Sequence, residues 1–255
     1  MGRIGIIGVG EIGRALVDGL CHGVEEPPEV WLSPRSARTA AELSRRYPDS
    51  VRVCAGNQGV VDRSELLIIA VRPEDRFEAL DGLRVGDDRV VVSVMTGVAI
   101  GELRRMLGTG APVVRAIPLP SARERRSVTV TCPAHPAVDE LFGGLGGTLH
   151  VADEATLNVF QALTGTLTTH YRYLATLTGW AARQGIPAED AERYVRGLFQ
   201  GVGRALGDDT RSLQQLARDH ETPRGLNERL RTTWFDPANA DALTGALDAL
   251  LADLE

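Results

Sequence analysis

Residues 1–152 alternate short apolar runs with helical stretches, and this alternation restricts the fold more than any other feature of the sequence. Several of the runs are apolar without a break, as in strands that are covered on both faces. Strands are predicted at 3–9, 29–33, 51–55, 65–71, 89–95 and 112–118. Helices are predicted at 11–23, 36–47, 73–83 and 99–108. The pattern predicts a doubly wound α/β domain, with two edge strands at 127–133 and 147–153 around a helix at 137–145.

After Asp153 the strand signals end and the pattern becomes helical. Segment 153–185 is long and apolar on nearly all sides, which predicts a helix that is buried on most faces. Further helices are predicted at 187–207, 211–220, 225–234 and 239–255. We therefore expect an α/β domain at 1–152 and an all-helical dimerisation domain at 153–255. A helix that is apolar all round usually packs against a second copy, so we expect a homodimer or an oligomer of dimers.

A GxGxxG motif follows the first predicted strand and opens the first predicted helix, at Gly8, Gly10 and Gly13. The first glycine permits a tight turn, the second lets the backbone approach a pyrophosphate, and the third allows close packing of helix and strand. The amides of Glu11 and Ile12 would then face the phosphates at the positive end of the helix. This context predicts a Rossmann-like dinucleotide site, and a glycine-rich turn without a ligand is the alternative.

The end of the second predicted strand distinguishes between cofactors. NAD sites usually carry an acidic residue there, which accepts a hydrogen bond from the ribose 2′-OH. Here Ser33, Arg35 and Ser36 offer a cation and two hydroxyls, which suit the 2′-phosphate of NADP. The sequence therefore predicts NADP, with NADPH as the reductant. The alternative is that these residues only cap a helix, with Ser36 as the N-cap.

Composition excludes several other functions. A net charge of -6 argues against nucleic acid as a partner. Because the three cysteines show no metal-ligand spacing, no metal site or disulfide framework is predicted, and a reducing cytoplasm is expected. No apolar run reaches membrane-spanning length, so no membrane association is expected. The chain contains no lysine, which excludes mechanisms that need a lysine as Schiff-base former or proton donor.

Motifs along nearly the whole chain resemble the pyrroline-5-carboxylate reductase family. After GxGxxG come SxRS, an asparagine and AVRP, and then VVSVMTGV, VVRAIPLP, Glu154, ALTGT and TPRGLNE, in the family's order and spacing. The resemblance implies a Rossmann-like domain followed by a helical dimerisation domain. It also implies reduction of a cyclic imine acid with NAD(P)H, so the expected partner is a small imine that carries a carboxylate.

The resemblance also implies roles for individual residues. Ser33, Arg35 and Ser36 would hold the adenosine phosphate, and Asn57 would contact adenosine or ribose. Residues near the nicotinamide would be Ala70, Val71, Arg72, Pro73, Met95, Thr96, Gly97 and Pro118. The TPRGLNE segment would hold the substrate carboxylate at the dimer interface. Its residues are Thr222, Gly225, Leu226 and Asn227, and Arg224 adds a cation that family members lack.

Several polar positions of the family have changed. The family asparagine after the sixth strand is replaced by Leu119, and the position of a threonine proposed to donate a proton is Leu198. His170 is the best replacement donor, with Thr166 one helical turn before it on the same face. A histidine with a purely structural role, or one at the surface, remains the alternative. These changes predict an altered substrate, bulkier or more hydrophobic than pyrroline-5-carboxylate.

Three rival classes share parts of this pattern. A β-hydroxyacid dehydrogenase needs a catalytic lysine, which the chain lacks. A deazaflavin-dependent NADP reductase shares the N-terminal motif but generally lacks the helical C-terminal half. The third rival is a non-catalytic NADP-binding sensor or regulator that has lost the family reaction, and the sequence leaves it open.

Overall fold

The computed structural model describes residues 2–254, which form two compact units. One unit contains residues 2–161 together with 253–254, and the other is Ala162–Ala252. The division falls inside helix α7 (Glu154–Thr164), whereas the sequence placed it just before this helix, after residue 152. Each unit is described below by itself.

The first unit is built on an eight-stranded sheet with the order β3-β2-β1-β4-β5-β6-β7-β8. The strands are β1 (Ile4–Ile7), β2 (Val30–Leu32), β3 (Val51–Val53), β4 (Leu66–Ile69), β5 (Val90–Ser93), β6 (Val113–Ile117), β7 (Thr129–Cys132) and β8 (Thr148–His150). All neighbours are parallel except β6 and β7, which are antiparallel. The predicted doubly wound, Rossmann-like fold is confirmed. The prediction that 127–133 is an edge strand was wrong, because β7 lies between β6 and β8.

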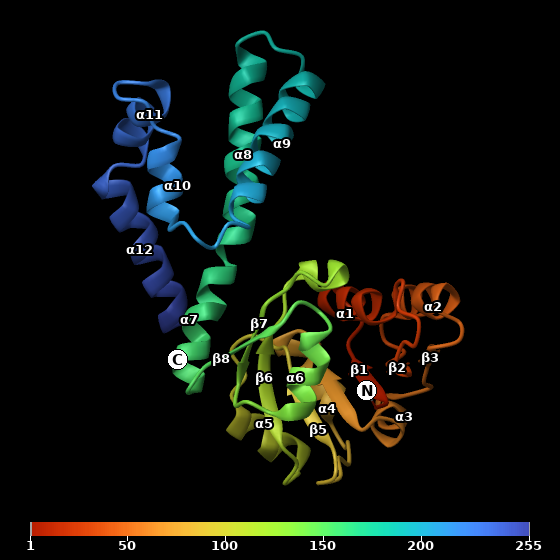
Figure 1. Ribbon diagram of the computed structural model, residues 1–255. Coiled ribbons are helices and arrows are strands. Elements are labelled where there is room, and N and C mark those ends of the chain that lie inside the picture. The colour runs from red at the N-terminus through yellow and green to blue at the C-terminus, as the bar shows by residue number, and fades with distance from the viewer. Residues whose placement is uncertain (1, 255) are drawn as a thin grey trace. The chain divides into compact units, whose positions relative to one another are not determined.

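Helices cover both faces of the sheet (Figure 1). One face packs against α1 (Glu11–Cys21), α2 (Ala37–Arg46) and α6 (Pro136–Gly143). The other packs against α3 (Asn57–Arg63), α4 (Arg76–Leu80) and α5 (Ile100–Leu107). Alternate strand residues point to opposite faces, so Ile6 and Ile68 join the first core while Ile7 and Ile69 join the second. Both faces are therefore apolar, as the unbroken apolar runs predicted.

Short elements complete this unit. The 3-10 helices are η1 (Pro73–Asp75), which precedes α4, and η2 (Pro120–Glu124), which follows β6. The sequence did not predict α3, because this helix is too short to show a helical repeat of apolar residues.

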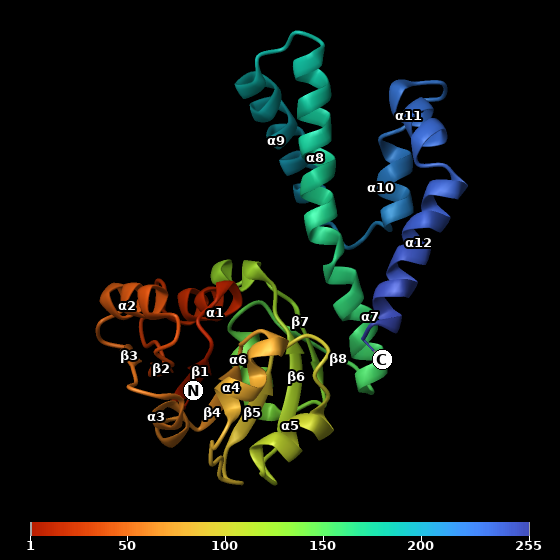
Figure 2. The same ribbon diagram turned by 180° about the vertical axis from the view of Figure 1, so that it is seen from behind.

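The second unit is helical (Figure 2). After the last residues of α7 come α8 (Thr166–Arg183), α9 (Ala188–Ala205), α10 (Leu213–Asp219), α11 (Leu226–Trp234) and α12 (Pro237–Ala252). The single helix predicted over 153–185 is divided at Gly165 into α7 and α8. None of the described residues of α8 is buried within the single chain, so the burial predicted for this helix would require a second copy. Across residues 2–254, no helix combines the length and the apolar character that a membrane span needs.

Candidate functional site

A pocket of about 250 Å³ lies at the carboxyl ends of β1, β2 and β4. The strand order reverses between β1 and β4, and open α/β sheets bind their ligands at such a switch point. We call it the switch-point pocket. Its lining residues are Ile7, Gly8, Val9, Gly10, Ser33, Arg35, Ser36, Asn57, Ala70, Val71, Arg72, Asp75 and Ala79. The chain thus brings together most of the residues that the sequence assigned to the cofactor.

The glycine turn between β1 and α1 is closely packed at Gly8 and Gly13 and open at Gly10. Gly8 has a φ of +98°, and a Cβ there would lie 2.5 Å from the carbonyl oxygen of Ala70. A Cβ on Gly13 would lie 2.4 Å from the carbonyl oxygen of Gly8, so this glycine lets α1 approach the turn. By contrast, a Cβ on Gly10 would meet no atom within 4 Å, which leaves open space above the N-terminus of α1. The first amides of α1 have no partner within the helix and are available to an anion there.

Glu11 and Ile12 contribute to this turn through their backbone only. The carboxylate of Glu11 pairs with Arg123 of η2, and the side chain of Ile12 packs against the core beside α1. Neither side chain lines the switch-point pocket. Their amides, as the sequence predicted for them, are the groups that lie at the positive end of the helix.

The three polar residues after β2 have different surroundings. Ser33 is only 1% exposed, and its Oγ accepts a hydrogen bond of 2.9 Å from the N–H of Gly8, so it holds the glycine turn. Ser36 is the N-cap residue of α2, yet its side chain makes no capping hydrogen bond. Arg35 is exposed, and its Nη2 lies 2.9 Å from Oδ1 of Asp75. Ser36 therefore stands at the N-cap position, as the capping alternative predicts, but its side chain does not make the capping hydrogen bond.

Residues after β4 form the opposite wall of the pocket. Ala70 donates its N–H to the carbonyl of Ile7 at 2.7 Å, which ties the end of β4 to the end of β1. Val71 and Arg72 line the pocket, and Pro73 begins η1 directly after them. Asn57 lines the pocket from α3 and donates its Nδ2 to the carbonyl of Ala79 at 2.9 Å. This hydrogen bond fixes the asparagine and leaves its Oδ1 as an acceptor.

Four of the residues predicted near the nicotinamide do not line this pocket, namely Met95, Thr96, Gly97 and Pro118. The side chain of Met95 is 3% exposed and packs in the core beside α5, which leaves only its backbone for a ligand. Thr96 and Gly97 are exposed in the loop after β5, and Pro118 is buried after β6. Because β4, β5 and β6 are parallel neighbours, all these positions follow the same edge of the sheet as Ala70.

Sequence reasoning missed one charged residue of the pocket. Asp75 lines it from η1 and also contacts Arg35. The sequence contained a signal for this residue, because Asp75 is the second residue after the AVRP motif. Only the structure brings that acid opposite the end of β2.

His170 lies on α8 in the helical unit and is exposed. Its ring is edge-on to Phe199 of α9, with the centroids 5.9 Å apart, and it lies 6.5 Å from the ring of Tyr173. Thr166 is one turn earlier on the same helix, but its hydroxyl donates to the carbonyl of Leu163 at 2.7 Å. The structure therefore keeps the imidazole within an aromatic cluster and directs the threonine hydroxyl to the backbone.

The TPRGLNE segment forms a turn that leads into α11. Gly225 is the N-cap and donates its N–H to the carbonyl of Thr222 at 2.7 Å. Arg224 has a φ of +61° and donates its backbone N–H to the carboxylate of Glu228. Asn227 donates its Nδ2 to the carbonyl of His220 at 2.7 Å, and Leu226 is 82% exposed. The turn thus presents the first amides of α11 to solvent, whereas the side chains of Asn227 and Glu228 hold the turn.

Known proteins share this fold and these motifs. Residues 3–97 match a family model described as NADP oxidoreductase, coenzyme F420-dependent. Pyrroline-5-carboxylate reductase 2 of Bacillus subtilis is 24% identical over 238 residues, covering 89% of this chain and 85% of that protein. The pyrroline-5-carboxylate reductase of Mycobacterium tuberculosis H37Rv is 30% identical over 180 residues, covering 65% and 60%.

Solved structures agree. Plasmodium falciparum pyrroline carboxylate reductase with NADP bound has a TM-score of 0.81 at 16% identity, covering 99% of this chain and 96% of that one. A reductive aminase from Aspergillus terreus has a TM-score of 0.61 at 18% identity, covering 80% and 74%. Together these findings support a divergent member of the pyrroline-5-carboxylate reductase family.

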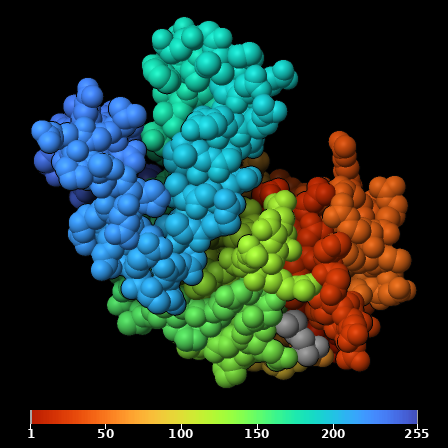
Figure 3. Space-filling model, turned by 45° about the horizontal axis from the view of Figure 1, so that its top comes forward, coloured from red at the N-terminus to blue at the C-terminus, as the bar shows by residue number. Residues whose placement is uncertain are grey.

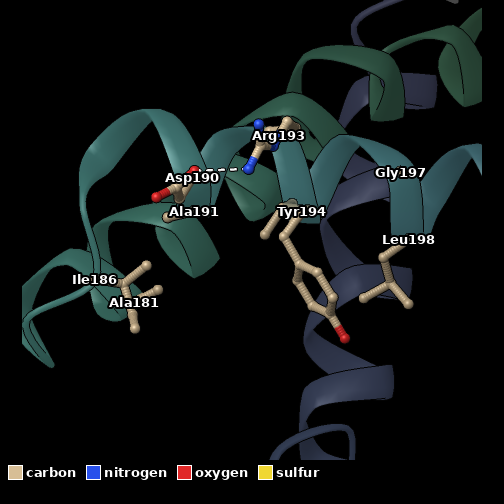
Figure 4. A pocket seen from close by; sticks show the side chains of 9 residues that line it. Ala181, Ile186, Asp190, Ala191, Arg193, Tyr194, Gly197 and Leu198 are labelled. Carbon is tan, nitrogen blue, oxygen red and sulfur yellow. Dashed lines mark hydrogen bonds and ion pairs between the residues drawn. The ribbon is translucent and has the colours of Figure 1, made fainter.

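The helical unit has a pocket of its own. A second pocket, of about 810 Å³, lies along α8 and α9 (Figure 4). Leu198, at the position where the family resemblance implies a proton donor, lines this α8–α9 pocket and is 50% exposed. Tyr194, one turn earlier on α9, lines it too and is 74% exposed. Arg193 and Asp190 form an ion pair of 2.8 Å there, and the surface around Leu198 is mainly apolar, because the other lining residues are Ala181, Ile186, Ala191, Val195 and Gly197.

Proposed function

We propose that this protein is an NADPH-dependent reductase of a small cyclic imine that carries a carboxylate. The observation that carries this proposal is the switch-point pocket, where the Gly8 turn, the open space above Gly10 and the Arg35–Ser36 pair lie together. Membership of the pyrroline-5-carboxylate reductase family gives the reaction class. The family model that matches residues 3–97 is described as coenzyme F420-dependent, but we propose no deazaflavin partner for this protein.

The residues of the pocket fit NADP. The amides at Gly10, Glu11 and Ile12 would hold the pyrophosphate, because a helix N-terminus and a glycine turn favour anions. Arg35 and Ser36 would hold the 2′-phosphate, while Ser33 keeps the turn in place from below. When bound, the cofactor supplies the hydride for the imine carbon.

The nicotinamide end would lie along the same edge of the sheet. Ala70, Val71, Arg72 and Pro73 follow β4, and the backbone of Met95, Thr96 and Gly97 follows β5. Pro118 follows β6, and Asn57 would contact the adenosine or its ribose. These assignments are proposals that rest on the family resemblance and on the parallel order of the strands.

Reduction of an imine also requires a proton on nitrogen, or an iminium that is already protonated. His170 is proposed to donate it, since an imidazole can act as a general acid and this one is exposed. Thr166 is proposed to act beside it, although its hydrogen bond to Leu163 would first have to open. The substrate carboxylate would bind the amides at Leu226 and Asn227, with Thr222, Arg224 and Gly225 beside them.

A bulkier or more hydrophobic imine than pyrroline-5-carboxylate is the expected substrate. Leu119, Leu167, Leu198 and Leu226 replace polar groups of the family, and an apolar surface around Leu198 favours apolar substrates. The test is NADPH oxidation with a panel of cyclic imines, each with and without a carboxylate. Faster reduction of the larger carboxylated imines supports the proposal. NADPH binding without reduction of any imine would favour a non-catalytic NADP sensor.

We further infer that the protein acts as a homodimer in the cytoplasm. Three large apolar residues of α9, Tyr194, Leu198 and Val202, are exposed at the surface of the helical unit, whose light-blue atoms are visible in Figure 3. Cys21, Cys54 and Cys132 are free and buried, as expected for a reducing compartment.

The buried thiols provide a test of the fold. Burial, and secondarily the charge of Asp18, raises the pKa of Cys21 to about 11, and burial is also the main cause that raises the pKa of Cys54 and Cys132. At pH 8 all three thiols should therefore be protonated and react slowly with a disulfide reagent in the native protein. All three should react at once in denaturant. Fewer than three reactive thiols in the unfolded protein would contradict free cysteines.

A further inference from the structure

The switch-point pocket contains a carboxylate that an NADP site does not require. Asp75 lines the pocket together with Arg35, and its Oδ1 lies 2.9 Å from Nη2 of that arginine. Oε2 of Glu78 lies 3.6 Å from the same nitrogen. The cation that is proposed to hold the 2′-phosphate is therefore already shared by two carboxylates.

The position of Asp75 is set by the local backbone. Pro73 begins η1, and the N–H of Asp75 donates to the carbonyl of Arg72 at 3.0 Å, which closes this turn beside the pocket. The side chains of Arg35 and Asp75 are 48% and 31% exposed, so a ligand can reach both. Asp75 thus faces the end of β2 from across the pocket.

We propose that Asp75 is a specificity-determining residue. It weakens the binding of NADPH relative to NADH, so the protein prefers NADPH by a smaller factor than it would without this carboxylate. A phosphate must compete with Asp75 and Glu78 for one guanidinium, and it also brings negative charge close to them. NADH has a hydroxyl at this place. That hydroxyl needs no cation, and a carboxylate can accept a hydrogen bond from it, as the acid of NAD sites does. The inference rests on the proposed NADPH-binding function.

The test is Asp75→Asn, which keeps the shape of the side chain and removes its charge. The dissociation constants of NADPH and NADH are measured by nicotinamide fluorescence on the full chain. NADPH should bind about threefold to fivefold more tightly, because a half-exposed ion pair no longer holds Arg35. NADH should bind no more tightly than before. The gain should shrink at high salt, because salt screens exposed charges.

Two controls separate this effect from a change in net charge. Asp81→Asn removes an exposed carboxylate at the end of α4 that does not line the pocket, and it should leave both constants unchanged. In an Arg35→Ala background, Asp75→Asn should improve NADPH binding much less, because it then relieves only the repulsion between carboxylate and phosphate. An equal gain in both backgrounds, or a gain with Asp81→Asn of the same size, overturns the proposal.

The same titrations distinguish failure of the inference about Asp75 from failure of the proposed function. A wild-type protein that binds neither nicotinamide cofactor contradicts the proposed function, and the inference fails with it. A wild-type protein that binds NADPH while Asp75→Asn leaves the ratio of the two constants unchanged contradicts the inference alone.

Discussion

Ser33 and Arg35 lie two residues apart, yet they serve the pocket in different ways. Ser33 is buried and accepts a hydrogen bond from Gly8, whereas Arg35 reaches across to Asp75. The first shapes the glycine turn, and the second supplies the charge at the end of β2. A substitution at Arg35 should therefore change cofactor affinity without changing the turn.

We predict that Arg35→Ala weakens NADPH binding by about tenfold to a hundredfold, because it removes charge-assisted hydrogen bonds to the 2′-phosphate. NADH affinity should barely change. Arg38→Ala is the matched control, since Arg38 is an exposed arginine of α2 that does not line the pocket. Fluorescence titrations with both cofactors decide the matter, and equal losses for NADPH and NADH would contradict the assignment.

His170→Phe is expected to lower turnover by roughly a hundredfold while NADPH binding stays intact, because the ring is kept and the proton is lost. Phenylalanine preserves the aromatic contacts with Tyr173 and Phe199. Tyr171→Phe removes an exposed hydroxyl next to it and should have little effect. Steady-state rates on the imine panel provide the measurement. Full activity of the His170 variant would leave that residue with a structural role.

At the scale of elements, a buried polar cluster joins α7 to the sheet. Arg115 of β6 is 3% exposed and donates to Glu154 at 3.0 Å and to Asn158 at 3.1 Å. Glu154 also accepts a hydrogen bond from the N–H of Ile100 at 3.0 Å, at the start of α5. Asn158 donates to the carbonyl of Leu254 at 3.0 Å. One glutamate thus links β6, α5 and α7.

Glu154→Ala should destabilise the protein by about 3 kcal/mol, because Arg115 would remain buried without its carboxylate. Thermal unfolding at a fixed protein concentration should show a fall of about 6 to 12 °C. Glu65→Ala is the control, since its pair with Arg3 has side chains that are 54% and 57% exposed, and it should cost less than about 1 kcal/mol. Equal shifts for the two variants would show that the cluster contributes no more than a surface pair.

At the scale of the whole molecule, the helical unit has few buried side chains and several large apolar ones that are exposed. Its buried side chains, among the described residues of Ala162–Ala252, are Ala162, Ala191, Val195 and Leu216. Trp180, Tyr194 and Leu198 are all at least half exposed. A core of this size is too small to stabilise an isolated unit of this length. These helices therefore need a further apolar surface that covers their exposed side chains.

We predict an obligate dimer through residues 153–255, which sedimentation at micromolar concentration should detect. Leu198→Glu should shift the protein towards monomer, because a charge would enter the apolar α8–α9 surface. Leu149→Glu changes an exposed leucine of β8, in the other unit, and should leave the dimer unchanged. A well-folded wild-type monomer would contradict the prediction.

Short-range patterns in the sequence determined the elements of the first unit. The apolar runs predicted all the strands of the sheet, and Gly8, Gly10 and Gly13 predicted the turn between β1 and α1. These features were readable because strand burial and glycine conformation depend on a few neighbouring residues. The helix α3 was missed because seven residues carry too little periodicity.

Only the tertiary structure decided which distant residues meet. No local pattern pairs Arg35 with Asp75 or Arg115 with Glu154, because each contact joins segments that the order of parallel strands and their crossovers brings together. The same reason explains α8, whose apolar composition predicted burial while the single chain leaves its residues uncovered. A helix is buried only where another surface covers it. The sequence of the helix shows which of its faces is apolar, but it does not show which surface covers that face.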